Sequence, residues 1–119
     1  MKLNHLSLSV PDVMETADFF ENYFGFHCEE IKGDHVIAVL RGEGDFLLVL
    51  TRLKDNSPAY PADFHFGFLL DSPDQVEDIH NRLMADGYEV PDAPRKIRNS
   101  YAFYFYVPGG VMAEISCEL

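Results

Sequence analysis

Residues 5–12 read His5-Leu-Ser-Leu-Ser-Val-Pro-Asp12, and residues 65–72 read His65-Phe-Gly-Phe-Leu-Leu-Asp-Ser72. In each stretch a short strand pattern opens with a histidine and runs into a turn that starts a helical pattern. Each helical pattern then ends at a glycine, Gly25 in the first copy and Gly87 in the second. The chain therefore contains an internal repeat of strand, capped helix and glycine.

The caps and the apolar spacing define the two expected helices. Asp12 followed by Glu15 fits a capping box, and Ser72-Pro73-Asp-Gln75 supplies an N-cap, a first-turn proline and an N3 glutamine. Apolar side chains then recur at helical intervals in both segments: Val13, Ala17, Phe20 and Phe24 in the first, and Val76, Ile79 and Leu83 in the second.

Three strand candidates follow each helix, separated by turn residues. They are Phe26–Ile31, Val36–Arg41 and Phe46–Thr51 in the first copy, and about Glu89–Val90, Tyr101–Tyr106 and Met112–Cys117 in the second, with a hairpin turn at Val107-Pro-Gly-Gly110. We therefore predict an α+β fold of two βαβββ modules, module 1 at about 1–52 and module 2 at about 63–119, joined by a linker at about 53–62.

A length of 119 residues suits one domain, 1–119, whose two modules share an interior. One βαβββ module covers only one face of its sheet with a helix. We expect the modules to associate, with curved mixed sheets that enclose a cavity lined by their concave faces.

The composition excludes several classes of partner. Nine Lys and Arg against 20 Asp and Glu give a net charge of −11, which repels phosphate backbones and anionic membranes, so we expect neither nucleic acid nor a membrane as partner. No apolar run approaches the ~18–20 residues of a membrane span, and no secretory signal is visible at the start, so a cytoplasmic location is expected. Cys28 and Cys117 do not form a disulfide framework, and we expect both to be reduced.

Three residues form a candidate metal site: His5, His65 and Glu114. Strand alternation places His5 on the same face as Ser7, away from the core leucines. Two imidazoles and one carboxylate suit a divalent transition metal with positions left open for substrate. A single strand histidine is more often simply hydrogen-bonded, and Glu114 alone could face solvent, but the matched positions in the repeat favour ligation.

The remaining histidines lack a counterpart in the repeat. They are His27, His35 and His80, which we expect to be surface or locally hydrogen-bonded residues.

The same motifs resemble the vicinal oxygen chelate superfamily, which includes glyoxalase I, extradiol ring-cleaving dioxygenases, fosfomycin-resistance thiol transferases and bleomycin-binding proteins. The resemblance covers essentially the whole chain. It is carried by His5-Leu-Ser-Leu-Ser-Val-Pro-Asp with Phe19-Phe-Glu-Asn-Tyr-Phe-Gly-Phe26, by His65-Phe-Gly-Phe, and by the closing segment Phe105-Tyr-Val-Pro-Gly-Gly-Val-Met-Ala-Glu114.

The resemblance implies a divalent ion (Fe, Mn, Ni or Zn) and a small-molecule substrate chelated through neighbouring oxygens, as in a lyase, a ring-cleaving dioxygenase or a thiol transferase. It also implies a homodimer in which each metal is shared between chains. Glyoxalase I takes a fourth ligand at the end of module 1, where this chain reads Phe46-Leu-Leu-Val-Leu-Thr51 with no acid or amide. Ser7 and Tyr104 fall where the fosfomycin enzymes carry a hydroxyl and a tyrosine, and they are the catalytic candidates, but the basic tail of those enzymes is absent. The alternative is a metal-free, bleomycin-resistance-like protein that sequesters a small molecule.

One basic cluster stands out in this acidic chain: Arg95, Lys96 and Arg98, placed between the first two expected strands of module 2. It could neutralise an anionic substrate at the rim of the cavity or simply be a solvated loop.

Overall fold

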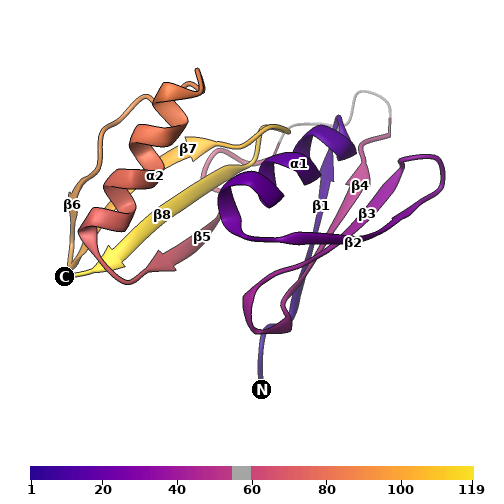
Figure 1. Cartoon of the computed structure of the whole chain (residues 1–119), viewed down its shortest axis with the longest axis horizontal. Helices are drawn as coiled ribbons and strands as arrows, with labels where there is room; N and C mark the ends of the chain where they lie inside the picture. The colour runs from indigo at the N-terminus through magenta and orange to yellow at the C-terminus, as the bar shows by residue number, and fades with distance from the viewer. Residues whose placement is uncertain (55–59) are drawn as a thin grey trace. The chain divides into compact units, whose positions relative to one another are not determined.

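The computed structural model describes residues 1–54 and 60–119, which form two compact units (Figure 1). Unit 1 comprises Met1–Ala59 together with Pro108–Gly110, and unit 2 comprises Tyr60–Val107 and Val111–Leu119. Part of the expected linker falls on residues 55–59, which lie outside the described residues.

Unit 1 contains one helix and a four-stranded mixed sheet. In chain order its elements are β1 (His5–Val10), α1 (Val13–Phe24), β2 (His27–Lys32), β3 (Ile37–Arg41), the short 3-10 helix η1 (Glu43–Asp45) and β4 (Leu47–Arg52). The strand order is β1-β4-β3-β2, in which β1 and β4 are parallel and the other pairs are antiparallel. Helix α1 packs against β2, β3 and β4.

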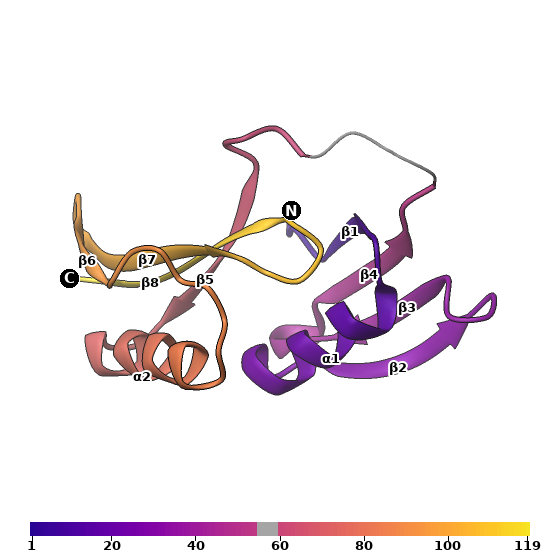
Figure 2. The same ribbon diagram turned by 90° about the horizontal axis from the view of Figure 1, so that it is seen from above.

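Unit 2 repeats this arrangement. Its elements are β5 (His65–Leu70), α2 (Pro73–Ala85), β6 (Arg95–Ile97), β7 (Ser100–Tyr106) and β8 (Met112–Glu118). The strand order is β5-β8-β7-β6, with β5 and β8 parallel. Helix α2 lies along β7 and β8 (Figure 2). The predicted α+β fold of two βαβββ modules is therefore confirmed, whereas the enclosed cavity stays a prediction.

Both helices begin and end as their sequences predict. The Asp12 carboxylate accepts a hydrogen bond from the backbone N–H of Glu15 at 3.0 Å, and the Ser72 hydroxyl accepts one from the N–H of Gln75 at 3.3 Å. Gly25 and Gly87 follow the helices with φ of +69° and +86°, a backbone conformation that favours glycine.

Strand alternation divides each sheet into a face covered by the helix and a helix-free face. The buried side chains face the helix, for example Leu8, Val10, Leu48 and Leu50 in unit 1 and Phe103, Phe105, Ala113 and Ile115 in unit 2. The alternate residues define the helix-free face. In unit 1 it includes His5, Ser7, Val39, Arg41 and Val49, and in unit 2 it includes His65, Gly67, Tyr104, Tyr106 and Glu114.

The first strand after α2 was predicted wrongly. The sequence pattern indicates Glu89–Val90, whereas the structure forms β6 at Arg95–Ile97. Pro91 and Pro94 interrupt the intervening segment, and neither has an N–H for a sheet ladder. Val90 is buried as a loop residue instead. The basic cluster consequently lies in β6 and its turn rather than in a loop between the first two strands of module 2.

The prediction for His80 was also wrong. Its Nδ1 is buried and has no hydrogen-bond partner in the described part of the chain. The imidazole packs edge-on against Phe103, with ring centroids 5.2 Å apart. His80 is therefore a packing residue between α2 and β7, whereas His27 and His35 are exposed.

The turn between β7 and β8 confirms the predicted hairpin. The N–H of Val107 donates to the carbonyl of Val111 at 2.9 Å. The Thr16 hydroxyl donates to the carbonyl of Pro108 at 3.1 Å. A Cβ added to Gly109, whose φ is +108°, would lie 2.9 Å from a methyl carbon of Val10. These contacts are the reason that Pro108–Gly110 group with unit 1.

Candidate functional site

Three of the candidate residues lie together on the helix-free face of unit 2. Glu114 on β8 is paired in register with Gly67 on β5 and with Tyr104 on β7. The His65 Nε2 lies 3.5 Å from the Glu114 Oε2. The Tyr104 ring stands edge-on to the His65 ring, with centroids 5.7 Å apart. The topology thus gathers an imidazole, a carboxylate and a phenol from three adjacent strands.

The His65 ring is oriented by the backbone. Its Nδ1 lies 2.9 Å from the carbonyl oxygen of Asp63. A carbonyl can only accept a hydrogen bond, so Nδ1 carries a proton, and Nε2 is the ring nitrogen that faces Glu114. Metal-ligating histidines are typically held in this way, by a hydrogen bond from the other ring nitrogen.

The distance between His65 and Glu114 suits a shared cation. Two ligand atoms, each about 2.1 Å from one ion, lie about 3–3.5 Å apart, and the observed separation of Nε2 and Oε2 is 3.5 Å. Two electron-pair donors at this distance repel each other unless a proton or a metal ion lies between them. The side chains are 39% and 26% exposed, so both remain accessible from solvent. The spacing of this pair suits two of the three predicted ligands of a divalent metal ion, and it equally suits an ion pair with a protonated imidazole.

Gly67 leaves space beside the carboxylate. A Cβ at this position would lie 3.4 Å from the Cβ of Glu114. A larger side chain would therefore extend over Glu114, and glycine keeps the carboxylate uncovered.

Burial raises the pKa of the Tyr104 phenol above its ordinary value. Hydrogen bonding to Glu114 and the negative charge of that carboxylate raise the pKa further, while the guanidinium groups of Arg98 and Arg95 oppose the shift. Tyr104 is therefore a protonated hydrogen-bond donor at neutral pH.

Unit 1 places His5 at the matching position of its own sheet. His5 pairs with Leu47 on β4, as His65 pairs with Met112 on β8. The His5 Nδ1 lies 2.7 Å from the side-chain oxygen of Asn4, which accepts a hydrogen bond from it and leaves Nε2 as the outer ring nitrogen.

The rest of the unit 1 surface differs from that of unit 2. Val49 occupies the position that matches Glu114, and Val39 occupies the position that matches Tyr104. Ser7, a catalytic candidate, is exposed opposite Val49. Unit 1 therefore contributes an imidazole and a hydroxyl but no carboxylate at this position.

No group of three or more His, Cys, Asp and Glu side chains is positioned to hold a metal ion within residues 1–54 and 60–119. The structure brings His65 and Glu114 together in unit 2, and His5 belongs to unit 1. Asn4 and Asp63, which orient the two imidazoles, were not identified from the sequence. Their signal is an oxygen-bearing residue one or two positions before each repeated histidine.

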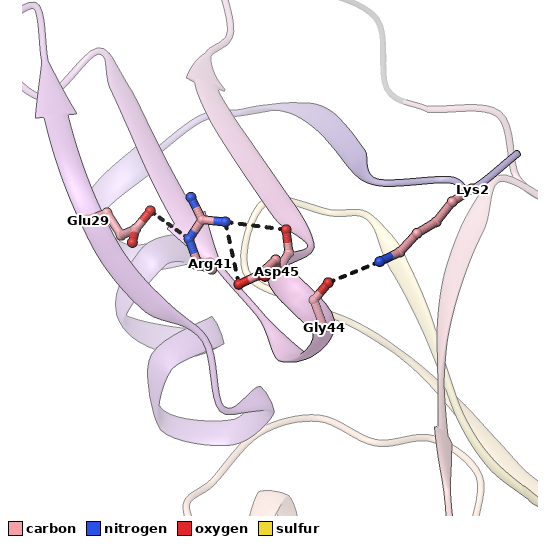
Figure 3. A network of polar contacts seen from close by, with 5 residues as sticks. All are labelled: Lys2, Glu29, Arg41, Gly44 and Asp45. Atoms are coloured by element: carbon pink, nitrogen blue, oxygen red, sulfur yellow. Dashed lines mark hydrogen bonds and ion pairs between the residues drawn. The ribbon is translucent and has the colours of Figure 1, made fainter.

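The cation nearest to His5 in the sheet register is neutralised locally. Arg41 pairs with Leu47, the same residue that pairs with His5. Its Nε donates to Glu29 at 3.0 Å and its Nη1 lies 3.8 Å from the Asp45 carboxylate, as Figure 3 shows beside the Lys2–Gly44 contact. The hydrogen bond to Glu29 raises the pKa of Arg41 above its ordinary value.

A separate groove lies in unit 1 between α1 and β2. It has a volume of about 310 Å³, and its lining includes Asp18, Glu21, Glu29 and Cys28. Burial raises the pKa of the Cys28 thiol, and the negative charges of Glu21 and Asp18 raise it further, while a backbone hydrogen bond of Glu30 opposes the shift. None of the predicted metal ligands lines this groove.

The fold and the residue pattern agree with comparisons to known proteins. A family model described as the Glyoxalase/Bleomycin resistance protein/Dioxygenase superfamily matches residues 2–115. The chain belongs to this superfamily. A solved structure described as a possible glyoxalase from Bacillus cereus is 38% identical in sequence to this chain. The two structures align with a TM-score of 0.88 over 98% of this chain and 99% of that one.

More distant structures show the same fold. A lactoylglutathione lyase from Agrobacterium tumefaciens is 21% identical, with a TM-score of 0.76 over 98% of this chain and 92% of that one. A glyoxalase/dioxygenase from Nostoc punctiforme is 21% identical, with a TM-score of 0.79 over 99% and 91%. No curated protein matches the chain. Neither helix of the described residues has the length and apolar character needed to cross a membrane.

Proposed function

We propose that this superfamily member is a divalent-metal-dependent enzyme that acts on a small molecule chelated through neighbouring oxygens. The observation that carries the proposal is the pairing of His65 and Glu114. The Nδ1 proton of His65 is held by the Asp63 carbonyl, and Nε2 lies 3.5 Å from the Glu114 carboxylate.

In this proposal His5, His65 and Glu114 hold the ion, which is Fe, Mn, Ni or Zn. The matching ring orientations of His5 and His65 support the assignment, since in both rings Nδ1 is held by an oxygen and Nε2 is left to contact a ligand. When bound, the ion supplies Lewis acidity to developing enolate or alkoxide charge, or oxygen chemistry in the case of iron. Val49 stands where a fourth protein ligand from unit 1 would be expected, and this leaves positions open for the substrate.

The other residues of the helix-free face bind and orient the substrate. The Tyr104 hydroxyl, kept protonated by its raised pKa, hydrogen-bonds Glu114 in the free protein and redirects that hydrogen bond to a substrate oxygen held beside the carboxylate. Leu69 and Tyr106 are exposed on the same face and suit an apolar or aromatic portion of the substrate. The reaction type is that of a lyase, a ring-cleaving dioxygenase or a thiol transferase. Similarity to the possible glyoxalase from Bacillus cereus supports a lyase, whereas Val49 at the position of the fourth glyoxalase I ligand favours the other two reaction types.

We further propose a homodimer in which His5 of one chain joins His65 and Glu114 of the other. A two-fold arrangement completes two sites with one self-complementary interface and covers exposed sheet edges.

Metal analysis tests the site directly. Protein stripped by chelation and reloaded with Mn²⁺, Ni²⁺ or Zn²⁺ is expected to bind one ion per chain, and His65→Ala is expected to abolish binding without loss of the fold. His27→Ala is the matched control, because His27 is an exposed strand histidine whose nearest carboxylate, Glu21, lies 3.8 Å away. Equal metal content in wild type and His65→Ala would contradict the assignment. Wild type that binds no ion but retains small molecules would favour sequestration.

Mixed dimers test the sharing of the site. Co-expressed His5→Ala and Glu114→Ala chains should form heterodimers that contain one intact site and recover about half of the wild-type metal content per dimer. Heterodimers that bind no metal would place each site within a single chain.

A further inference from the structure

The basic cluster of unit 2 concentrates positive charge in an otherwise acidic chain. Arg95, Lys96 and Arg98 supply three of the nine basic residues within four positions, while the net charge of the chain is −11. The overall field therefore repels anions, and an anion that binds must be held by a local arrangement of cations.

The register of β6 separates these cations between the two faces of the sheet. Arg95 pairs with Ala102, which lies two residues before Tyr104 and therefore on the helix-free face. Lys96 pairs with Tyr101, whose hydroxyl donates to Glu77 of α2, so Lys96 belongs to the helix-covered face. Of these adjacent cations, only Arg95 shares a face with His65 and Glu114.

Arg98 occupies the first position of the two-residue turn between β6 and β7. Its φ is +55°, a conformation that in such hairpin turns usually calls for glycine. Within the described residues it makes no hydrogen bond or ion pair, but its charge acts on the Tyr104 phenol, as that of Arg95 does. An arginine thus stands where the backbone favours glycine.

Arg95 and Arg98 form fewer or longer ion pairs than Arg41 does, so their guanidinium groups are more accessible to a bound anion. Arg41 is held by Glu29 and Asp45 at 3.0 and 3.8 Å. Arg95 has one looser, solvent-exposed neighbour, Asp92 at 3.7 Å. Such an exposed pair contributes little and exchanges readily for a better partner.

We propose that Arg95 and Arg98 form an oxyanion-binding position at the β6 edge of the sheet, on the far side of Tyr104 from His65, so that the substrate carries a carboxylate or phosphoryl group at a distance from its chelating oxygens. The inference rests on the proposed function for its choice of ligand, a small-molecule substrate. Guanidinium groups suit this role because their planar N–H donors match the oxygens of both anions.

The test is an NMR titration of the metal-free 119-residue chain with inorganic phosphate and, separately, with acetate, at constant ionic strength. Arg98→Gly removes the charge and relieves the positive φ, so the fold should be at least as stable as wild type. Saturable shifts of β6 and β7 amides are expected in wild type. Arg98→Gly should raise the Kd for the anion about tenfold, which is the effect of losing one charge-assisted hydrogen bond. The tighter-binding anion identifies the phosphoryl or carboxylate class.

Lys96→Gln is the matched control, with the same loss of charge on the opposite face, and it should change the Kd less than about twofold. Equal weakening in Lys96→Gln and Arg98→Gly, or no saturable binding in wild type, would overturn the inference. Metal binding measured separately, on the same variants after reloading with Zn²⁺, separates the two proposals. Phosphate binding without metal binding would contradict only the proposed metal site. Metal binding without anion binding would contradict only this inference.

Discussion

In unit 1 the residue opposite Ser7 is Val49, whereas in unit 2 the residue opposite Gly67 is Glu114. The two sheets share strand order, parallel pairing and a histidine at the start of the edge strand. Their buried faces follow one alternation, but their helix-free faces carry different chemistry. Packing against a helix therefore constrains the residues on one face of each sheet to be apolar, whereas the residues on the helix-free face can differ between the two units.

Glu114→Gln should have the largest effect on metal binding, because it removes the carboxylate that distinguishes unit 2 from unit 1 at this position. Loss of an outer-shell partner of a metal ligand costs about 10–100-fold in affinity, so loss of the ligand itself should exceed about a hundredfold. Metal affinity is measured by competition with a fluorescent chelator. Glu118→Gln on the same strand is the control, and a similar affinity for both variants would contradict the assignment.

Gly109→Ala should be the most damaging change to stability, because the turn between β7 and β8 packs against Val10. The added Cβ would lie 2.9 Å from a Val10 methyl carbon at a backbone φ of +108°. We expect a loss of about 3 kcal/mol from strain and overpacking together. Gly110→Ala, with φ of +80° and open space around it, should cost only about 1 kcal/mol. Urea unfolding measures both, and equal losses would show that Val10 contact is unimportant.

Val49→Glu gives unit 1 the carboxylate that unit 2 has at the matching position, and it tests whether this position of unit 1 faces the metal ion. Val49 lies half-buried on the helix-free face, so the substitution leaves the core against α1 intact. A further carboxylate ligand should raise metal affinity about tenfold and reduce the open positions. The same chelator competition measures it, with Val39→Glu on the neighbouring strand as control. Unchanged affinity in Val49→Glu would mean that this position does not face the ion.

The sequence predicted most of the fold because its signals are local. Caps at Asp12 and Ser72, glycines at Gly25 and Gly87, and strand alternation each act over a few residues. The position of β6 was missed because three residues with two charges carry no apolar alternation, and pairing with β7 alone makes them a strand.

The candidate site was predictable only in part. The repeat and the strand pattern identify His65 and Glu114, and the family resemblance identifies Tyr104. Pairing of β5, β8 and β7 then brings the three residues together. The ring orientations were not predictable, because they depend on oxygens of Asn4 and Asp63 placed by the start of each strand. Likewise, the buried Nδ1 of His80 depends on how α2 packs on Phe103.

Each unit has one free cysteine, Cys28 in unit 1 and Cys117 in unit 2. We expect Cys28 to react faster with alkylating agents than Cys117, and its rate of alkylation to rise with pH. Cys117 is fully buried, whereas Cys28 is partly exposed with a pKa raised above 9.0 by burial and by nearby acids. Since the thiolate is the nucleophile, Cys28 alkylation should accelerate with a midpoint above pH 9.0. Asp18→Asn should lower that midpoint slightly, and Asp78→Asn on α2 should not. Mass spectrometry of iodoacetamide-treated protein follows both cysteines, and faster labelling of Cys117 would contradict the burial pattern.

The most direct test of the metal assignment is long-range ¹H–¹⁵N NMR of the histidine rings during Zn²⁺ addition. We predict that Nε2 of His5 and Nε2 of His65 shift on binding, that their Nδ1 atoms stay protonated against Asn4 and Asp63, and that His27, His35 and His80 do not respond. Ligation through Nδ1, or Zn²⁺-dependent shifts confined to the other three histidines, would contradict the assignment.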